Sequence, residues 1–369
     1  MTPLDDEAAA AWARDQLVAL IEIASPSGGE HAVAAHLERV AAGLGHPVAR
    51  HDVPGCGPNL VIGAPDATLM LTAHMDTVVP TWEWDGRAVV DGPVVRGLGA
   101  QDDKGCIVAA LLAFELLRAD DVDVATLPVS IGLTVDEEED GTGSIALAEL
   151  GPPAHVIALE GTELRVCRAE AGTLDCWIEV SGRSNHGSEP EFGDNAVHKA
   201  IALASELLAL SVFNRSHPEV CDSVAYIQEF VGGSELFVVP DLARLHVVVR
   251  FGAVGEAAEA EHELAALCAR WDARLELIEA VDPVIAAPDA PLVRALEAVV
   301  ERVTGHPAEH AAMPSWTDAH SFAERGSTAV VFGPGTLRVA HRPEEHIDVR
   351  EIVTCARILA DVARGSARL

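Results

Sequence analysis

The stretch LPVSIGLTVDEEEDGTG, residues 127–143, joins an apolar run to five consecutive acids, Asp136–Asp140. A short apolar run that ends in turn residues is typical of a buried strand. Carboxylates at the end of such a strand repel one another, and burying them is costly unless a cation neutralises them. The stretch therefore allows two interpretations, a solvated acidic turn or a site that binds something positive.

Similar apolar runs occur at 68–73, 155–160 and 327–333. Between them, apolar residues recur at helical spacing, which predicts an alternation of strands and helices. The predicted helices cover residues 7–24, 25–44 (with a Ser/Gly start), 104–118, 195–210, 256–271, 290–304 and 349–363. This alternation predicts an α/β fold whose central sheet is mostly parallel.

The middle of the chain has a different pattern. Residues 173–184 and 241–254 alternate apolar and polar side chains, and 220–233 is a further strand candidate. With two predicted helices between them, these strands form an α+β unit of the size of a small domain. We therefore predict an inserted domain at 173–284, which interrupts a catalytic domain made of 1–172 and 285–369.

Composition restricts the class of protein. The chain has 369 residues and a net charge of −33, which argues against binding to nucleic acid or to an anionic membrane surface. Its seven cysteines are scattered without CxxC spacing, as expected of reduced, packed thiols. The acidic, amphipathic N-terminus has no basic start or apolar run, so we expect a cytoplasmic protein.

Polar side chains follow four of the predicted strands. They are His74 and Asp76, Glu137 and Glu138, Glu160, and His341. In α/β sheets, ligands bind beyond the carboxyl ends of the strands, so these side chains are expected to converge. Imidazoles together with carboxylates suit Zn²⁺.

Each motif taken alone also has an ordinary structural interpretation. His74 and Asp76 are spaced as a surface pair, or as a metal-bound imidazole with a carboxylate that fixes its tautomer. Asp102, in GLGAQDDKG at 97–105, suits a helix cap and equally a carboxylate that bridges two cations. The acidic turn is a solvated loop or a ligand next to a general base, and His341 alone is typical of a surface histidine. There is no GxSxG elbow, P-loop or HExxH motif.

Together these motifs resemble one known family. The segments that carry the resemblance, in order, are HMD, GLGAQDDKG, TVDEEEDGTGS, ALEGT, SGRSNHGSEPEFGDNAV, VVPDLARLHVVVR, TDA and GPGTLRVAHRPEEHI. They span nearly the whole chain. The sequence resembles the dizinc metallohydrolases that include glutamate carboxypeptidase, aminoacylase, acetylornithine deacetylase and succinyl-diaminopimelate desuccinylase.

The resemblance implies a role for each motif residue. His74 and Glu160 match ligands of one Zn²⁺, Glu138 and His341 match ligands of the other, and Asp102 matches the carboxylate that bridges both. Glu137 matches the general base, Asp76 the carboxylate behind His74, His186 an oxyanion-stabilising histidine from a dimer partner, and Arg250 the arginine that holds the substrate carboxylate. Co²⁺ or Mn²⁺ are expected substitutes for zinc.

The implied activity is hydrolysis of an amide bond in an N-acyl amino acid or small peptide with a free carboxylate. The inserted domain is expected to act as a lid and dimerisation domain in a homodimer. Glu at position 160, where dipeptidases and tripeptidases of the family usually carry Asp, favours a deacylase or carboxypeptidase. A dipeptidase or aminopeptidase remains an alternative, and a non-catalytic ligand-binding protein is a second one, although the presence of Glu137 argues against it.

Three positions depart from the family pattern. Asp140 and Gly141 stand where the family usually has Gly and Ser. Phe237 replaces an asparagine that lies near the substrate in the family, which weakens any inference about specificity. His320, which follows the TDA motif, has no role that the sequence explains.

Overall fold

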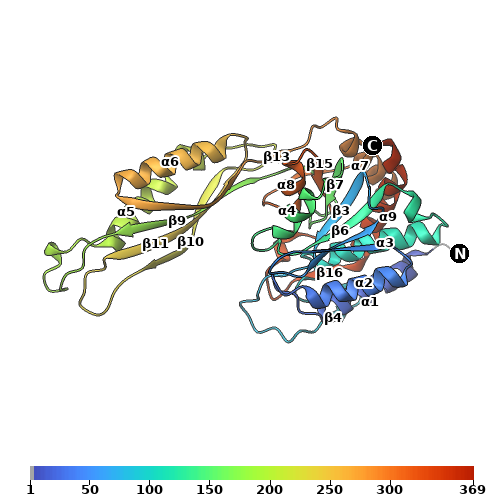
Figure 1. The fold of residues 1–369 in the computed structure, drawn as a ribbon, viewed down its shortest axis with the longest axis horizontal. Helices are drawn as coiled ribbons and strands as arrows, with labels where there is room; N and C mark the ends of the chain where they lie inside the picture. Colours follow the sequence, from blue (N-terminus) through green and yellow to red (C-terminus); the bar gives the residue numbers. More distant parts are fainter. Residues whose placement is uncertain (1–3) are drawn as a thin grey trace. The chain divides into compact units, whose positions relative to one another are not determined.

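The computed structural model describes residues 4–369, and the chain divides into two compact units (Figure 1). The first comprises Met1–Arg168, Ala286–Ala311 and Thr317–Leu369, and the second comprises Ala169–Ile285 and Ala312–Trp316. The second unit is thus inserted into the sequence of the first.

A sheet with a parallel core organises the first unit. Within residues 4–369 this sheet has nine strands in the order β1-β2-β6-β3-β7-β15-β8-β13, with β14 paired to β8. Its strands are β1 (Val48–Asp52), β2 (Pro58–Gly63), β3 (Leu69–His74), β6 (Val129–Thr134), β7 (His155–Ala158), β8 (Val166–Glu170), β13 (Val284–Ile285), β14 (His310–Met313) and β15 (Thr328–Val331). β6, β3, β7 and β15 pair in parallel, while β1 and β2 join antiparallel. The prediction of an α/β fold with a mostly parallel central sheet is confirmed.

Helices cover this sheet and exclude solvent from its central strands. They are α1 (Asp6–Ile21), α2 (His31–Gly43), α3 (Lys104–Ala119), α4 (Thr142–Glu149), α7 (Pro291–Thr304), α8 (Asp318–Ala323) and α9 (Val349–Gly365). β3 and β6 are buried at every position, as expected of strands that are covered on both faces. A small separate sheet has the order β16-β5-β4 and consists of β4 (Val89–Asp91), β5 (Val94–Arg96) and β16 (His346–Asp348).

α3 is the central helix of the first unit. It is buried along nearly its whole length and contacts α1, α9 and β3. A helix that is apolar on all sides belongs in the core of a large domain. Its first turn therefore has a fixed place, and the residues just before it, Asp102 and Asp103, are held with it.

The second unit is built on an antiparallel sheet. Its strands, in the order β10-β11-β9-β12, are β9 (Gly172–Ser181), β10 (Val224–Gly232), β11 (Leu242–Phe251) and β12 (Ala273–Val281). β9 and β11 alternate buried and less buried positions, as expected of a sheet with one covered face. α5 (Ala196–Leu208) and α6 (Glu256–Arg270) supply that cover (Figure 1).

The sequence pattern missed the short helices α4 and α8 and several strands: β1, β2, β4, β5, β8, β12, β13, β14 and β16. α4 and α8 are short, and a helix of one or two turns shows too few periods to be recognised. β12 carries a register shift between Leu277 and Glu279, which interrupts its alternation of side chains. Across residues 4–369, the helices are all too short or too polar to cross a membrane.

The cysteines provide a test of this packing. Five of them are buried: Cys106, Cys167, Cys176, Cys268 and Cys355. Burial raises the pKa of the Cys167 and Cys176 thiols to about 12, so little reactive thiolate exists at pH 8. With a chromogenic disulfide reagent at that pH, we expect Cys56 and Cys221 to react first and the buried five only after denaturation. Rapid labelling of all seven in the native protein would contradict the packing.

Candidate metal centre

The carboxyl ends of three neighbouring parallel strands bring potential ligands to one edge of the sheet. β3 ends at His74, which pairs in register with Thr134 at the end of β6. Glu137 and Glu138 follow β6, and Glu160 follows β7, the other neighbour of β3. The convergence predicted from the strand ends therefore occurs.

One group of donors surrounds the His74 ring. Its Nε2 lies 2.9 Å from Asp102 Oδ1, 3.8 Å from Glu160 Oε1 and 3.9 Å from Glu137 Oε2. The side chains of His74, Glu137 and Glu160 can each offer an atom within 4.8 Å of the others. That spacing is compatible with a shared metal ion.

A second group surrounds the His341 ring. Its Nε2 lies 3.0 Å from Glu138 Oε1 and 3.3 Å from Asp102 Oδ2. The two oxygens of Asp102 thus face two different histidines, as required of a carboxylate that bridges two cations. The structure brings together all five side chains that the resemblance assigns as ligands.

The acidic turn divides into a buried part and an exposed part. The side chains of Glu137 and Glu138 are only 11% and 8% exposed, whereas Glu139 and Asp140 are exposed. A solvated acidic turn therefore describes only the last two acids. Gly141, one of the departures from the family pattern, has a φ of 63° and caps α4, a conformation that glycine adopts without strain.

The electrostatics of the cluster favour a cation. Burial raises the pKa of Glu137 and of Glu160 well above the usual range, and neighbouring carboxylates add to the effect. Burial would lower the pKa of His74, yet the carboxylates around it raise that pKa well above its ordinary value. Hydrogen bonds to Asp102 and Glu138 raise the pKa of His341 to about 10. These raised pKa values favour the protonated, positive form of both histidines, and divalent cations would supply the same positive charge.

This donor set fits a divalent metal pair. Two imidazoles and four carboxylates lie together in this cluster. Among these six side chains, the two histidines are the ones that can carry positive charge. Both chemistry and burial therefore suit ions such as Zn²⁺, Co²⁺ or Mn²⁺.

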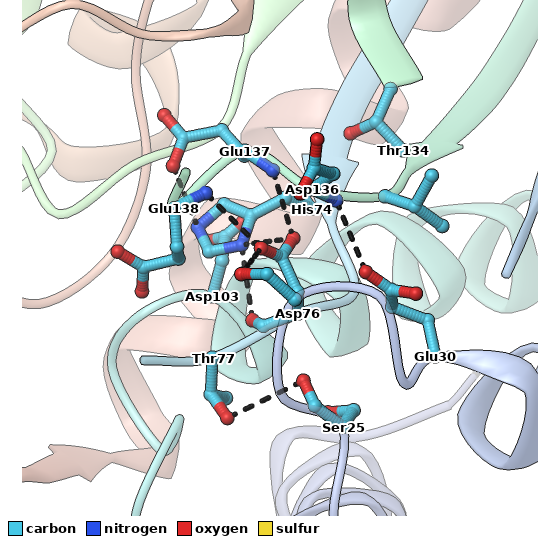
Figure 2. Close-up of polar contacts among 12 residues, drawn as sticks. Ser25, Glu30, His74, Asp76, Thr77, Asp103, Thr134, Asp136, Glu137 and Glu138 are labelled. Carbon is cyan, nitrogen blue, oxygen red and sulfur yellow. Dashed lines mark hydrogen bonds and ion pairs between the residues drawn. The ribbon is translucent and has the colours of Figure 1, made fainter. Parts of the chain in front are cut away.

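Asp76 lies behind His74, but its contacts differ in detail from the prediction. His74 Nδ1 is 3.1 Å from the backbone oxygen of Asp76 and 3.4 Å from its Oδ1. The Asp76 carboxylate also accepts the backbone N–H groups of Glu137 and Glu138, each at 3.1 Å (Figure 2). It accepts the Ser27 hydroxyl as well, at 2.8 Å. Asp76 thus connects the His74 strand to the acidic turn.

His186 and Arg250 belong to the second unit. His186 is exposed, with Nδ1 2.7 Å from the Ser188 hydroxyl. Arg250 is half-buried near the end of β11, and its buried Nε makes no hydrogen bond within the described residues. Phe237, which neighbours the His186 segment through the Gly187 N–H to Phe237 carbonyl bond, has a φ of 63°. This left-handed conformation is uncommon for a bulky residue such as phenylalanine, whereas asparagine adopts it more readily.

Sequence reasoning did not identify Asp318 as part of the site, although it quoted the TDA motif. Asp318 is buried at the start of α8, accepts a hydrogen bond from Thr134, and helps to raise the pKa of Glu137. Its signal was weak because α8 is short and far along the chain from the acidic turn. His320, two residues later, is buried with Nε2 3.3 Å from Glu324 Oε1.

Two acetylornithine deacetylases are among the known proteins similar to this chain. An acetylornithine deacetylase from Myxococcus xanthus is 30% identical over 319 residues, which cover 81% of this chain and 80% of that protein. A second, from Klebsiella pneumoniae (strain 342), is 31% identical over 320 residues, covering 80% and 79%.

Solved structures share the fold. A tripeptidase from Staphylococcus aureus matches with a TM-score of 0.83 at 20% identity over the whole of both chains. A dinuclear metal binding peptidase of family M20 from Bacillus subtilis matches with a TM-score of 0.71 at 15% identity, over 99% of this chain and 100% of that one. The profile described as peptidase family M20/M25/M40 matches residues 70–365. The chain therefore belongs to this peptidase family, as its motifs predicted, and is a hydrolase of amide or peptide bonds.

Proposed function

We propose that this protein is a dizinc deacylase, which hydrolyses the amide bond of an N-acyl amino acid with a free carboxylate. One observation carries the proposal: two adjacent glutamates of the acidic turn face different partners. Glu138 Oε1 lies 3.0 Å from His341 Nε2, whereas Glu137 Oε2 lies 3.9 Å from His74 Nε2. A ligand next to a base is the division of labour that metal-assisted hydrolysis needs.

The proposed ligands are His74 and Glu160 for one ion, Glu138 and His341 for the other, and Asp102 for both. When bound, the cations lower the pKa of a water molecule and polarise the substrate carbonyl. Glu137 is suited to take the proton of the attacking water because burial already raises its pKa. It then delivers that proton to the leaving amine.

We assign His186 and Arg250 to the substrate. His186 donates a hydrogen bond to the carbonyl oxygen as negative charge develops there. Arg250 holds the free carboxylate, for which a guanidinium is the best matched side chain. We further propose that the second unit acts as a lid and as the dimerisation domain of a homodimer in the cytoplasm.

Two facts favour a deacylase over a peptidase. The curated relatives at about 30% identity are acetylornithine deacetylases, and position 160 is Glu rather than the Asp usual in dipeptidases and tripeptidases. The tripeptidase among the structural matches is only 20% identical, so it indicates the fold and not the substrate.

Metal removal is expected to destabilise the protein, because the carboxylates around His74 then lose the cations that offset their repulsion. At zinc concentrations 100-fold above the dissociation constant, each bound ion adds about 2.7 kcal/mol to the free energy of unfolding. Calorimetry with chelator and then with added Zn²⁺, Co²⁺ or Mn²⁺ measures this as a rise in Tm. The double variant His74→Ala with His341→Ala serves as control and should show no metal-dependent rise. A wild-type Tm that ignores all three metals would contradict the metal centre.

Substrate class is tested with zinc- or cobalt-loaded protein on N-acetyl and N-succinyl amino acids, dipeptides and aminoacyl p-nitroanilides. We expect turnover of N-acyl amino acids. We expect Glu137→Ala to lower kcat by roughly 10²–10⁴-fold, the usual contribution of a general base, while metal analysis still finds two ions per chain. Turnover of p-nitroanilides alone would instead indicate an aminopeptidase, and no turnover of any substrate a binding protein. Full activity of Glu137→Ala would remove Glu137 as the base.

Sharing of the active site between subunits is tested by mixing variants. His186→Ala is expected to lower kcat by roughly 10²–10³-fold, as does the loss of other oxyanion donors, and Arg250→Ala to raise KM. If the two residues reach one site from different subunits, each mixed dimer contains one intact site, so an equal mixture regains about a quarter of the wild-type activity. A mixture no more active than the average of the two variants would place both residues of a site on one chain.

A further inference from the structure

The backbone of the acidic turn is held by buried side chains from other parts of the chain. Four consecutive N–H groups, those of Val135, Asp136, Glu137 and Glu138, each donate to a side-chain oxygen. The acceptors, in order, are Asn59 Oδ1 at 3.1 Å, Glu30 Oε1 at 3.2 Å, Asp76 Oδ1 at 3.1 Å and Asp76 Oδ2 at 3.1 Å. Figure 2 shows the bonds to Glu30 and Asp76. The turn therefore has its amides fixed independently of any metal.

We call the three acceptor residues, Asn59, Glu30 and Asp76, the clamp. The turn that the clamp holds contains a left-handed residue. Asp136 has a φ of 62°, in the left-handed region that L-residues adopt seldom, although aspartate adopts it more often than most. Such a conformation persists only where the surroundings determine it. The turn is further closed by the Gly141 N–H, 2.6 Å from the Asp136 carbonyl, and by the Thr142 hydroxyl, 2.6 Å from the Asp136 carboxylate. The left-handed residue directly precedes Glu137 and so sets the direction of both glutamates.

Glu30 is the charged member of this set that takes no part in the metal centre described above. It is fully buried and forms no ion pair within residues 4–369. Its carboxylate accepts the Gly28 and Gly57 N–H groups at 2.8 Å in addition to that of Asp136. A buried carboxylate is tolerated when several N–H groups donate to it. Here those donors come from three segments, so Glu30 ties the loop before α2 and the start of β2 to the acidic turn.

The backbone at Gly57 lies close to the Glu30 side chain. A Cβ added to Gly57 would lie 2.8 Å from the Glu30 Cβ, so the backbone at 57 accepts no larger side chain without a shift. On the other side of the turn, a Cβ on Gly143 would lie 2.2 Å from the Val135 carbonyl. The turn is thus packed as well as hydrogen-bonded.

We propose that Glu30 is a positioning residue for hydrolysis, which holds the 135–138 turn so that Glu137 faces the reacting water and Glu138 its metal. Glu30 is not one of the candidate metal donors, and it acts through the backbone of Asp136. The inference rests on the proposed function, because it takes Glu137 as the base.

The first test is amide hydrogen exchange, which needs no substrate. Glu30→Gln keeps the size of the side chain but removes the charge and replaces one acceptor oxygen by a donor. In chelator-treated protein, we expect it to speed exchange in the peptide covering 133–143 by about tenfold, the effect of losing one hydrogen bond to a charged group. Glu115→Gln is the matched control, since Glu115 is also buried in the first unit but bonds Arg118 on α3. It should leave exchange at 133–143 unchanged.

The second test separates positioning from stability. We expect Glu30→Gln to lower kcat about tenfold, to leave KM within about twofold, and to retain two metal ions per chain. Glu115→Gln should keep wild-type kcat even if its Tm falls by a similar amount. If Glu30→Gln does not fold, Glu30→Asp, which keeps the charge but is one methylene shorter, takes its place with the same expectations.

The outcomes separate the two proposals. Unchanged exchange at 133–143, or a kcat equal to that of Glu115→Gln, overturns the positioning role of Glu30. Loss of metal in step with kcat overturns it as well, because Glu30 would then act on the ligand set rather than on the base. If the wild-type protein hydrolyses no substrate, the proposed function fails, and the positioning role for hydrolysis fails with it; the exchange measurement then shows only whether the clamp exists.

Discussion

The carboxylate of Asp102 is the contact on which the candidate site depends. Its two oxygens face His74 and His341, residues that lie far apart in the sequence, and so it joins the end of β3 to a loop near the C-terminus. Asp102 stays ionised despite its burial because hydrogen bonds from these two histidines lower its pKa. The other acids gather around this pair of contacts. Without a bridging carboxylate, the two donor groups would be two unrelated clusters.

The position of Asp102 follows from the helix behind it. α3 begins at Lys104, directly after Asp102 and Asp103, and packs on all sides in the core. The Lys104 ammonium donates to the Ile23 carbonyl at 2.9 Å, and the Asp103 carboxylate accepts the His74 N–H at 3.0 Å. The helix start therefore joins α1, β3 and the bridging carboxylate in one rigid arrangement. A helix N-terminus also favours negative charge, which offsets part of the repulsion among the acids.

The parts of this arrangement that lie close in sequence could be predicted. Apolar runs ending in His74, in Glu137 and Glu138, and in Glu160 indicated both the parallel sheet and the edge at which ligands meet, because parallel strands present the same end together. The family resemblance supplied the roles. Sequence patterns could not supply the contacts of Glu30 or Asn59 with the acidic turn, because one buried polar residue has no periodicity and its partner lies more than 70 residues away. The same holds for Asp318 on the short helix α8.

The clamp explains how two adjacent glutamates of the acidic turn can enter the same site. Adjacent residues in an extended strand point to opposite faces, and adjacent residues in a helix diverge by about 100°, so two neighbouring glutamates do not ordinarily serve one site in different roles. The left-handed conformation at Asp136 changes the direction of the chain just before them, and the Asp76 carboxylate then binds both of their N–H groups from one side. With their backbone fixed on that side, both side chains extend toward the metal donors, Glu137 toward His74 and Glu138 toward His341. The five acids are therefore not equivalent: Asp136 shapes the turn, the next two enter the site, and the last two remain in solvent.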